Sequence, residues 1–135
     1  MKNVYADVGQ LFAQSTIADP RVSAVMMGQL VKGMGADHVC WGTDAIWTGS
    51  PQWQIEALRR LEIPDELQRK FGLSPLGPAD GPVKSAIFGG NNARLYDYGP
   101  KQMAELDGDG ISRYKVVYER EGAGRTNLAY GYAKR

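Results

Sequence analysis

The first forty residues combine two short apolar runs with one longer segment of helical spacing. Residues 3–8 are β-branched and aromatic and end before a glycine, which predicts a short buried strand. Asp19 followed by Pro20 predicts a helix start, because aspartate caps a first turn and proline fits the first helical position. Apolar residues then recur at helical spacing over 20–33. A second strand is predicted at 38–42, and we expect the two strands to be adjacent and parallel.

The pattern after the second strand is mostly helical. Helices are predicted to start at Ser50 and at Pro64, and the second of them to end at Gly72. The remaining predictions are a loop at 73–82, helices at 83–88, 91–98, 100–106 and 111–119, and a loop or tail at 122–135. A parallel sheet is normally buried on both faces and has more than two strands. The pattern therefore indicates part of a larger α/β domain.

Charge and cysteine content narrow the classes of partner and environment. Sixteen Lys and Arg nearly balance fifteen Asp and Glu, so the net charge of +1 gives no reason to expect nucleic acid or a membrane surface as a partner. The longest apolar stretch is far shorter than a membrane span. Cys40 is the single cysteine, which excludes an intrachain disulfide and is compatible with a reducing compartment. We expect a soluble protein; the compartment stays open, with the cytoplasm favoured.

The chain resembles the end of an amidohydrolase-related (β/α)8 barrel in three segments: 3–7 (NVYAD), 39–44 (VCWGTD) and 87–96 (IFGGNNARLY). Their order matches the seventh strand, the eighth strand and the closing helix of that family. The resemblance implies an α/β fold that is the C-terminal portion of a TIM barrel, with about two β/α units in 1–98 and a helical extension and tail in 99–135. Such a barrel takes about 250 residues, so we expect the missing units to precede Met1.

Asp44 is the residue that we expect to carry chemistry. It follows a predicted buried strand, and barrel active sites are built at the carboxyl ends of the strands. The resemblance implies that Asp44 corresponds to the family's strand-eight aspartate, which binds a divalent metal, zinc or manganese, and takes a proton from metal-bound water. The alternative is that Asp44 only shapes a turn. Because the family's histidine ligands have no counterpart here, we expect the chain alone to hold no metal tightly.

Other residues near the predicted strands are weaker candidates. Trp47 is placed to line a substrate pocket, whereas Trp53 has the helical spacing of a core residue. Asp7 ends the first strand and either orients a ligand or forms a turn, and the turn is the preferred interpretation. His38 lies at the opposite end of its strand from Asp44, and Cys40 has no histidine placed to activate it. Both are interpreted as structural.

Two glycine-containing motifs suggest ligand sites that their sequences do not support. Gly89, Gly90 and Asn91 lack the ending of a phosphate-binding loop, and we interpret them as a helix start with Asn91 as a candidate N-cap. Residues 107–110 (DGDG) resemble the start of a calcium loop but lack its closing glutamate.

Three hypotheses for function follow. The first is the C-terminal fragment of a metal-dependent enzyme that hydrolyses or decarboxylates a small carboxylate or ring compound, inactive alone. The second is a non-catalytic binding or assembly module derived from the barrel, and the third is a truncated chain without a function of its own. In the first two we expect self-association, or association with an N-terminal barrel half, because the two strands would lack neighbours.

Overall fold

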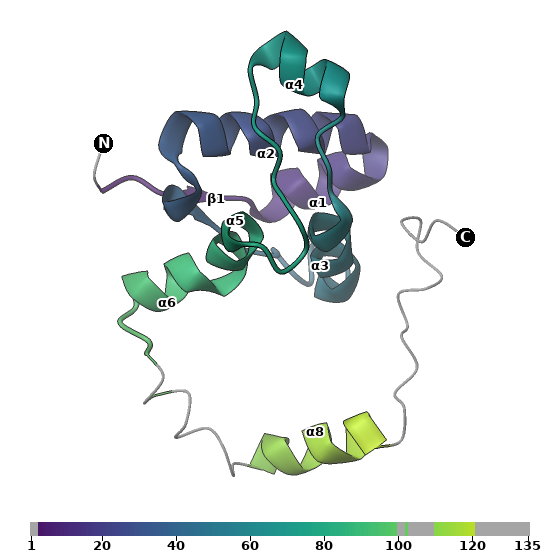
Figure 1. Cartoon of the computed structure of the whole chain (residues 1–135). Helices are drawn as coiled ribbons and strands as arrows, with labels where there is room; N and C mark the ends of the chain where they lie inside the picture. Colours follow the sequence, from purple (N-terminus) through teal and green to yellow (C-terminus); the bar gives the residue numbers. More distant parts are fainter. Residues whose placement is uncertain (1–2, 100–101, 103–109, 121–135) are drawn as a thin grey trace.

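The computed structural model describes residues 3–99, 102 and 110–120, most of them in helices (Figure 1). The elements in chain order are β1 (Ala6–Asp7), α1 (Gly9–Ala18), α2 (Pro20–Met34), the 3-10 turn η1 (Ala36–His38), β2 (Val39–Cys40), α3 (Pro51–Arg60), α4 (Asp65–Phe71), α5 (Pro82–Ser85), the π-helical turn η2 (Ala86–Gly90), α6 (Asn91–Leu95) and α8 (Gly110–Arg120). Helix α1 packs against α2 and α3.

The two strands are adjacent and parallel, as the sequence predicts. Ala6 pairs with Val39 and Asp7 with Cys40, and the amide of Val8 donates to the carbonyl of Cys40 at 3.2 Å. Each strand has only two residues, whereas the sequence predicts five or six. The ladder is short because the chain leaves the extended conformation at once on one side of each strand: α1 begins at Gly9, and η1 occupies 36–38.

Capping residues set the boundaries of the predicted helices. Asp19 Oδ1 accepts a hydrogen bond from the amide of Arg21 at 2.9 Å, and Pro20 opens α2. Ser50 caps α3 in the same way through the amide of Gln52, at 3.3 Å. Helix α4 ends at Gly72, which adopts a left-handed conformation with φ of 62°. These three predictions are confirmed, because each boundary depends on a local side chain or a glycine.

Helix α1 is missed by the sequence analysis. Its apolar residues Leu11 and Ile17 are each 64% exposed, whereas Ser15 and Thr16 are buried. The hydroxyl groups of Ser15 and Ser23 lie 2.7 Å apart and satisfy each other between α1 and α2. Phe12 and Ala13 are also buried, so α1 has a buried face that mixes apolar and hydroxyl side chains, while two of its large apolar residues face outward. This mixture weakens the periodicity that identifies an amphipathic helix.

The later helical segments differ in detail from their predictions. Helical structure runs without a break from Pro82 through Gly89 and Gly90, and α6 ends at Leu95 rather than at residue 98. The helix predicted at 111–119 is confirmed as α8. Apart from Gln102, the helix predicted at 100–106 and the tail predicted at 122–135 lie outside the described residues. Within 3–99, 102 and 110–120, no helix has the length and hydrophobicity needed to cross a membrane.

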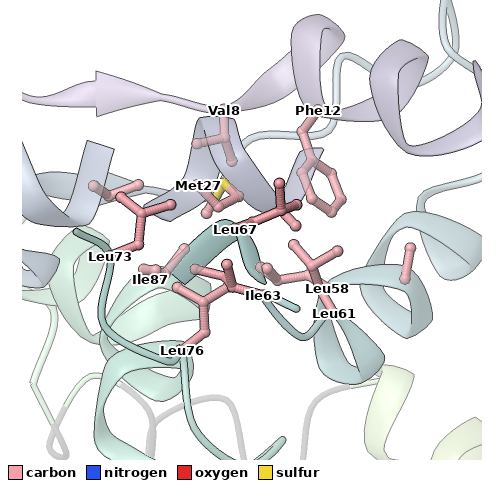
Figure 2. Packing of buried hydrophobic residues seen from close by; sticks show 13 residues of the cluster. Val8, Phe12, Met27, Leu58, Leu61, Ile63, Leu67, Leu73, Leu76 and Ile87 are labelled. Atoms are coloured by element: carbon pink, nitrogen blue, oxygen red, sulfur yellow. The ribbon is translucent and has the colours of Figure 1, made fainter. Parts of the chain in front are cut away.

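One hydrophobic core lies between the strands and the helices (Figure 2). Its buried residues are Val8, Phe12, Ala24, Met27, Val39, Ala57, Leu58, Leu61, Ile63, Leu67, Leu73, Leu76 and Ile87. The 73–81 segment has no regular structure, as predicted, yet it supplies Leu73 and Leu76 to this core. That burial fixes the path of an otherwise irregular segment.

The edge of β2 that faces away from β1 is covered by side chains and backbone from η2 and α6. Asn91 Nδ2 donates to the carbonyls of Ala36 and Val39 at 2.8 and 2.7 Å. Asn92 Nδ2 donates to the carbonyl of Trp41 at 3.1 Å, and the Trp41 amide donates to the carbonyl of Ile87 at 3.0 Å. The interpretation of Asn91 as a helix N-cap is therefore wrong, because its side chain bonds to η1 and β2 instead.

Lys84 connects α5 to the end of α3. Its side chain is 1% exposed, and Nζ donates to the carbonyls of Arg59 and Leu61 at 2.9 and 2.8 Å. These carbonyls belong to the last turn of a helix, where backbone acceptors lack helical partners. Burial lowers the pKa of Lys84 below its usual value of 10.5, partly offset by the charge of Glu62.

We predict that Lys84→Met reduces the free energy of unfolding by about 2 kcal/mol at neutral pH, because one buried and one partly buried carbonyl lose a charged donor. The loss should grow as the pH rises toward 10.5. At pH values between the lowered pKa of folded Lys84 and the usual pKa of 10.5, the unfolded wild-type chain binds more protons than the folded chain. The free energy of unfolding of the wild type therefore increases with pH over this range. The variant has no lysine at this position and lacks the increase. Urea denaturation at several pH values measures both effects.

Lys32→Met is the matched control for this prediction. Lys32 Nζ also donates to a carbonyl at a helix end, that of Phe71 at 2.8 Å, but the bond is exposed to solvent. Its loss should cost less than about 1 kcal/mol. Equal losses from the two variants would show that the burial of Lys84 contributes nothing.

Candidate functional site

The two faces of the sheet carry different side chains. On one face, Val8 and Val39 belong to the core, and Trp41 packs edge-on against Phe12 and at a tilt against Phe88, with ring centroids 5.5 and 5.1 Å apart. Alternate residues of a strand point to opposite faces. The residues between these therefore lie on the other face of the sheet.

That other face holds the polar and titratable side chains of both strands. The rings of Tyr5 and His38 stack with centroids 4.8 Å apart at the amino ends of the strands. Asp7 and Cys40 follow as a cross-strand pair, and Gly42 lies two residues beyond the end of β2. Burial, together with the charge of Asp7, raises the pKa of the Cys40 thiol. A raised pKa keeps the thiol protonated, which agrees with the structural interpretation of Cys40.

Asp7 forms the turn that joins β1 to α1. Its Oδ1 accepts a hydrogen bond from the amide of Gly9 at 3.0 Å, and this amide belongs to the first residue of α1. The structure thus supports the turn-forming interpretation of Asp7. The carboxylate lies against Gly42, where any β-carbon would overlap both of its oxygens. Gly42 leaves the space that Asp7 needs.

Asp44 lies just beyond the carboxyl end of β2 and is exposed to solvent. Its backbone has a φ of 49°, an uncommon conformation for a residue other than glycine. Its carboxylate packs against Gly9, with its atoms 3.3 to 3.4 Å from the position that a β-carbon on Gly9 would take. Asp7 and Asp44 therefore adjoin the same residue, at the amino end of α1. A helix amino terminus favours negative charge, which suits both carboxylates.

A compact loop presents Asp44 and Trp47. The Thr48 amide donates to the carbonyl of Asp44 at 3.2 Å, and the Ala45 amide donates to Thr43 Oγ1 at 3.2 Å. At the tip, Ile46 and Trp47 are 83% and 86% exposed. The loop therefore places a free carboxylate beside a large exposed apolar surface.

The described residues do not form a metal site by themselves. No group of three or more His, Cys, Asp or Glu side chains suited to a metal occurs within 3–99, 102 and 110–120. One oxygen of Asp7 is already used by the Gly9 amide. A zinc site needs about three protein ligands, so a metal at Asp44 would require ligands from elsewhere.

The remaining sequence candidates lie apart from Asp44 or outside the described residues. His38 Nδ1 lies 3.1 Å from Asp37 Oδ1, and this interaction lowers the pKa of Asp37. Trp53 is partly buried, with its Nε1 3.2 Å from the position of a β-carbon on Gly49. Gly89 and Gly90 lie within η2 and form no loop. Residues 107–109 of the calcium-like motif are not among those described.

Gln54 is the residue of this region that the sequence analysis missed. It is completely buried on α3, and its Nε2 donates to the Thr43 carbonyl at 3.0 Å and to Thr48 Oγ1 at 2.9 Å. The only signal in the sequence is a polar residue among the apolar positions of a predicted helix, and such a residue is usually interpreted as surface.

We predict that Gly42→Ala lowers the free energy of unfolding by about 1 to 3 kcal/mol, because the new methyl group overlaps the Asp7 carboxylate. In an Asp7→Ala background the same substitution should cost less than about 0.5 kcal/mol, since the overlap is gone. Gly33→Ala is the control, because nothing lies within 4 Å of its added carbon in α2. It should stabilise the protein by up to about 1 kcal/mol. Denaturant unfolding of the five proteins tests the argument, which fails if the Gly42→Ala cost persists without Asp7.

The chain matches no protein-family model, no curated protein and no solved structure with which it was compared. The function proposed for the site therefore depends on its residues and their geometry, together with the resemblance noted in the sequence.

Proposed function

We propose that this chain is the C-terminal part of an amidohydrolase-like metal-dependent enzyme and that Asp44 is its contribution to the active site. In this proposal residues 1–98 are the last two β/α units and closing helix of a barrel, and 99–135 are an extension. The complete enzyme would hydrolyse or decarboxylate a small carboxylate or ring compound, and the chain alone would be inactive.

The convergence of Asp7 and Asp44 is the observation that carries this proposal. Asp7 is the last residue of β1, Asp44 follows the adjacent parallel strand β2, and both adjoin Gly9. Barrel enzymes build their sites at this end of the strands, where side chains from several strands meet. An isolated turn would not require a second carboxylate from the neighbouring strand.

Asp44 and Asp7 would have different tasks. Asp44 is exposed, with no hydrogen bond described for its carboxylate, so both oxygens are available to a cation or to a proton. Asp7 keeps Gly9 and the start of α1 in place, and Asp44 rests against that residue. The exposed Trp47 would supply apolar surface for the substrate. The other metal ligands, and the metal's Lewis acidity, would come with the missing units.

A closed barrel places one demand on the edge of β2. In a closed barrel the last strand pairs with the first strand, so the outer edge of β2 would have to be free. On that edge, however, Val39 and Trp41 already form hydrogen bonds with residues of η2 and α6. Association with an N-terminal half would therefore have to exchange these hydrogen bonds for strand pairing.

We predict that the chain alone binds zinc or manganese no better than an ordinary carboxylate surface, as measured by calorimetry. Co-expressed with an N-terminal half that bears a His-x-His strand, it should gain a stoichiometric site. Asp44→Asn should weaken that site at least tenfold, because an amide replaces the charged ligand while asparagine tolerates the positive φ.

Asp97→Asn is the matched control, since Asp97 is also exposed and has a φ of 52°. It should leave the affinity unchanged. A tight site on the chain alone that disappears in Asp44→Ala, or a reconstituted site indifferent to Asp44→Asn, would contradict the proposal.

A second candidate function, a non-catalytic assembly module, is favoured by the outer edge of β1. Val8 directs its amide toward β2, so alternate residues Tyr5 and Asp7 direct their backbone groups to the opposite side. Val4, just before the strand, is 44% exposed. An edge of this kind, with an apolar residue beside it, pairs readily with another strand.

We predict that the purified chain self-associates and that Val4→Lys shifts it toward the 14.8 kDa monomer, because a charged lysine blocks edge pairing. Light scattering at several concentrations measures the shift. Val22→Lys is the control, because Val22 is also exposed, at 53%, but lies on α2. A wild-type chain that stays monomeric at high concentration would exclude assembly through this edge.

A further inference from the structure

Gln54 fixes the loop that carries Asp44 from inside the protein. The side chain belongs to α3 and has no exposed surface. Its amide nitrogen donates to the carbonyl of Thr43, the residue directly before Asp44, and to the hydroxyl of Thr48. The same hydroxyl donates to the Thr43 carbonyl at 2.6 Å. The two ends of the loop are thus joined through one buried amide.

Stability alone is a poor explanation for a glutamine at this position. Its Oε1 is buried and has no hydrogen-bond partner within the described part of the chain. A buried acceptor left unpaired costs free energy, and an apolar side chain of similar size would avoid that cost. The amide is therefore better explained by the two hydrogen bonds that it donates, because a hydrophobic residue could not hold the loop in this conformation.

What they hold is the backbone on both sides of Asp44. The Thr48 amide bonds to the Asp44 carbonyl, and the Thr43 hydroxyl receives the Ala45 amide. Asp44 itself adopts a positive φ, which is unfavourable for a non-glycine residue unless its surroundings enforce it. With the ends of the loop pinned by Gln54, the carboxylate stays against Gly9.

We propose that Gln54 is a positioning residue that sets the conformation of the 43–48 loop, and with it the placement of Asp44 and the exposed Trp47. The significance of this role for catalysis rests on the proposed function, whereas the structural claim does not. Gln54 touches no substrate or metal in this proposal and acts only through Thr43 and Thr48.

Hydrogen exchange on the full chain without metal tests the proposal. Gln54→Met keeps the volume and removes both donors. We expect the amides of Ala45 and Thr48 to exchange about tenfold faster, while that of Gly35, bonded to Val31 in α2, changes less than about twofold. The melting temperature should change by only a few degrees, because the unpaired acceptor is removed as well.

Two further variants separate a local effect from general destabilisation. Thr48→Val removes the hydroxyl group that accepts the second hydrogen bond of Gln54, and it leaves the buried side chain of Gln54 unchanged. It should also accelerate hydrogen exchange at the Ala45 amide. Gln68→Met removes a partly buried glutamine on α4, whose Nε2 donates to the Ile63 carbonyl at 2.7 Å, and should leave the loop amides unchanged. The proposal is overturned if Gln54→Met leaves exchange in the loop within twofold of wild type, if it accelerates exchange at Gly35 equally, or if Gln68→Met reproduces its effect.

The reconstituted assembly gives the functional readout. Gln54→Met should weaken the metal site that depends on Asp44 by several-fold, less than Asp44→Asn does. Loosening of the loop without any change in metal affinity would retain the structural claim and reject its link to the site. A failure of metal binding in wild type would reject the proposed function alone, because the exchange result does not depend on it.

Discussion

The arrangement of the second half of the described fold depends on satisfying the backbone of β2, a buried strand of only two residues. Buried amides and carbonyls need partners, and one neighbouring strand serves only one side. Asn91, Asn92 and Ile87 serve the other side. This requirement fixes the helical segment that begins at Pro82, and that segment carries Lys84 to the end of α3. Helix α3 in turn carries Gln54, so the loop with Asp44 is connected step by step to the strand that it follows.

The sequence predicts those parts of the fold that depend on local chemistry. Asp19, Ser50 and Gly72 set helix ends through their own side chain or conformation, and the structure agrees. It does not predict features that depend on distant partners. Helix α1 is hidden because Ser15 bonds to Ser23 while Leu11 faces outward. The lengths of the two strands are overestimated, because β-propensity does not indicate how many residues of a segment find a partner strand.

The site shows the same division. A parallel order of strands is enough to predict that a residue ending one strand, Asp7, and a residue following the other, Asp44, share one end of the sheet. The requirement for glycine at 42 becomes visible only when the Asp7 carboxylate is seen against it. Gln54 has only a weak sequence signal, a polar residue among apolar helix positions, because its importance comes from carbonyl and hydroxyl groups of the loop that precedes it. Metal ligation by Asp44 and a substrate contact by Trp47 stay predictions.

The side-chain bonds of Asn91 and Asn92 that cover this edge of β2 and the turn before it join residues 51 to 55 positions apart in the chain. During synthesis, β2 is therefore made long before Asn91 and Asn92 leave the ribosome. Over that interval the strand can pair with β1, but its other edge has no permanent partner and is open to neighbouring nascent chains. Nascent chains on one polysome would be most prone to associate through this edge during that interval. The speed of translation between residues 41 and 92 would set the duration of the interval.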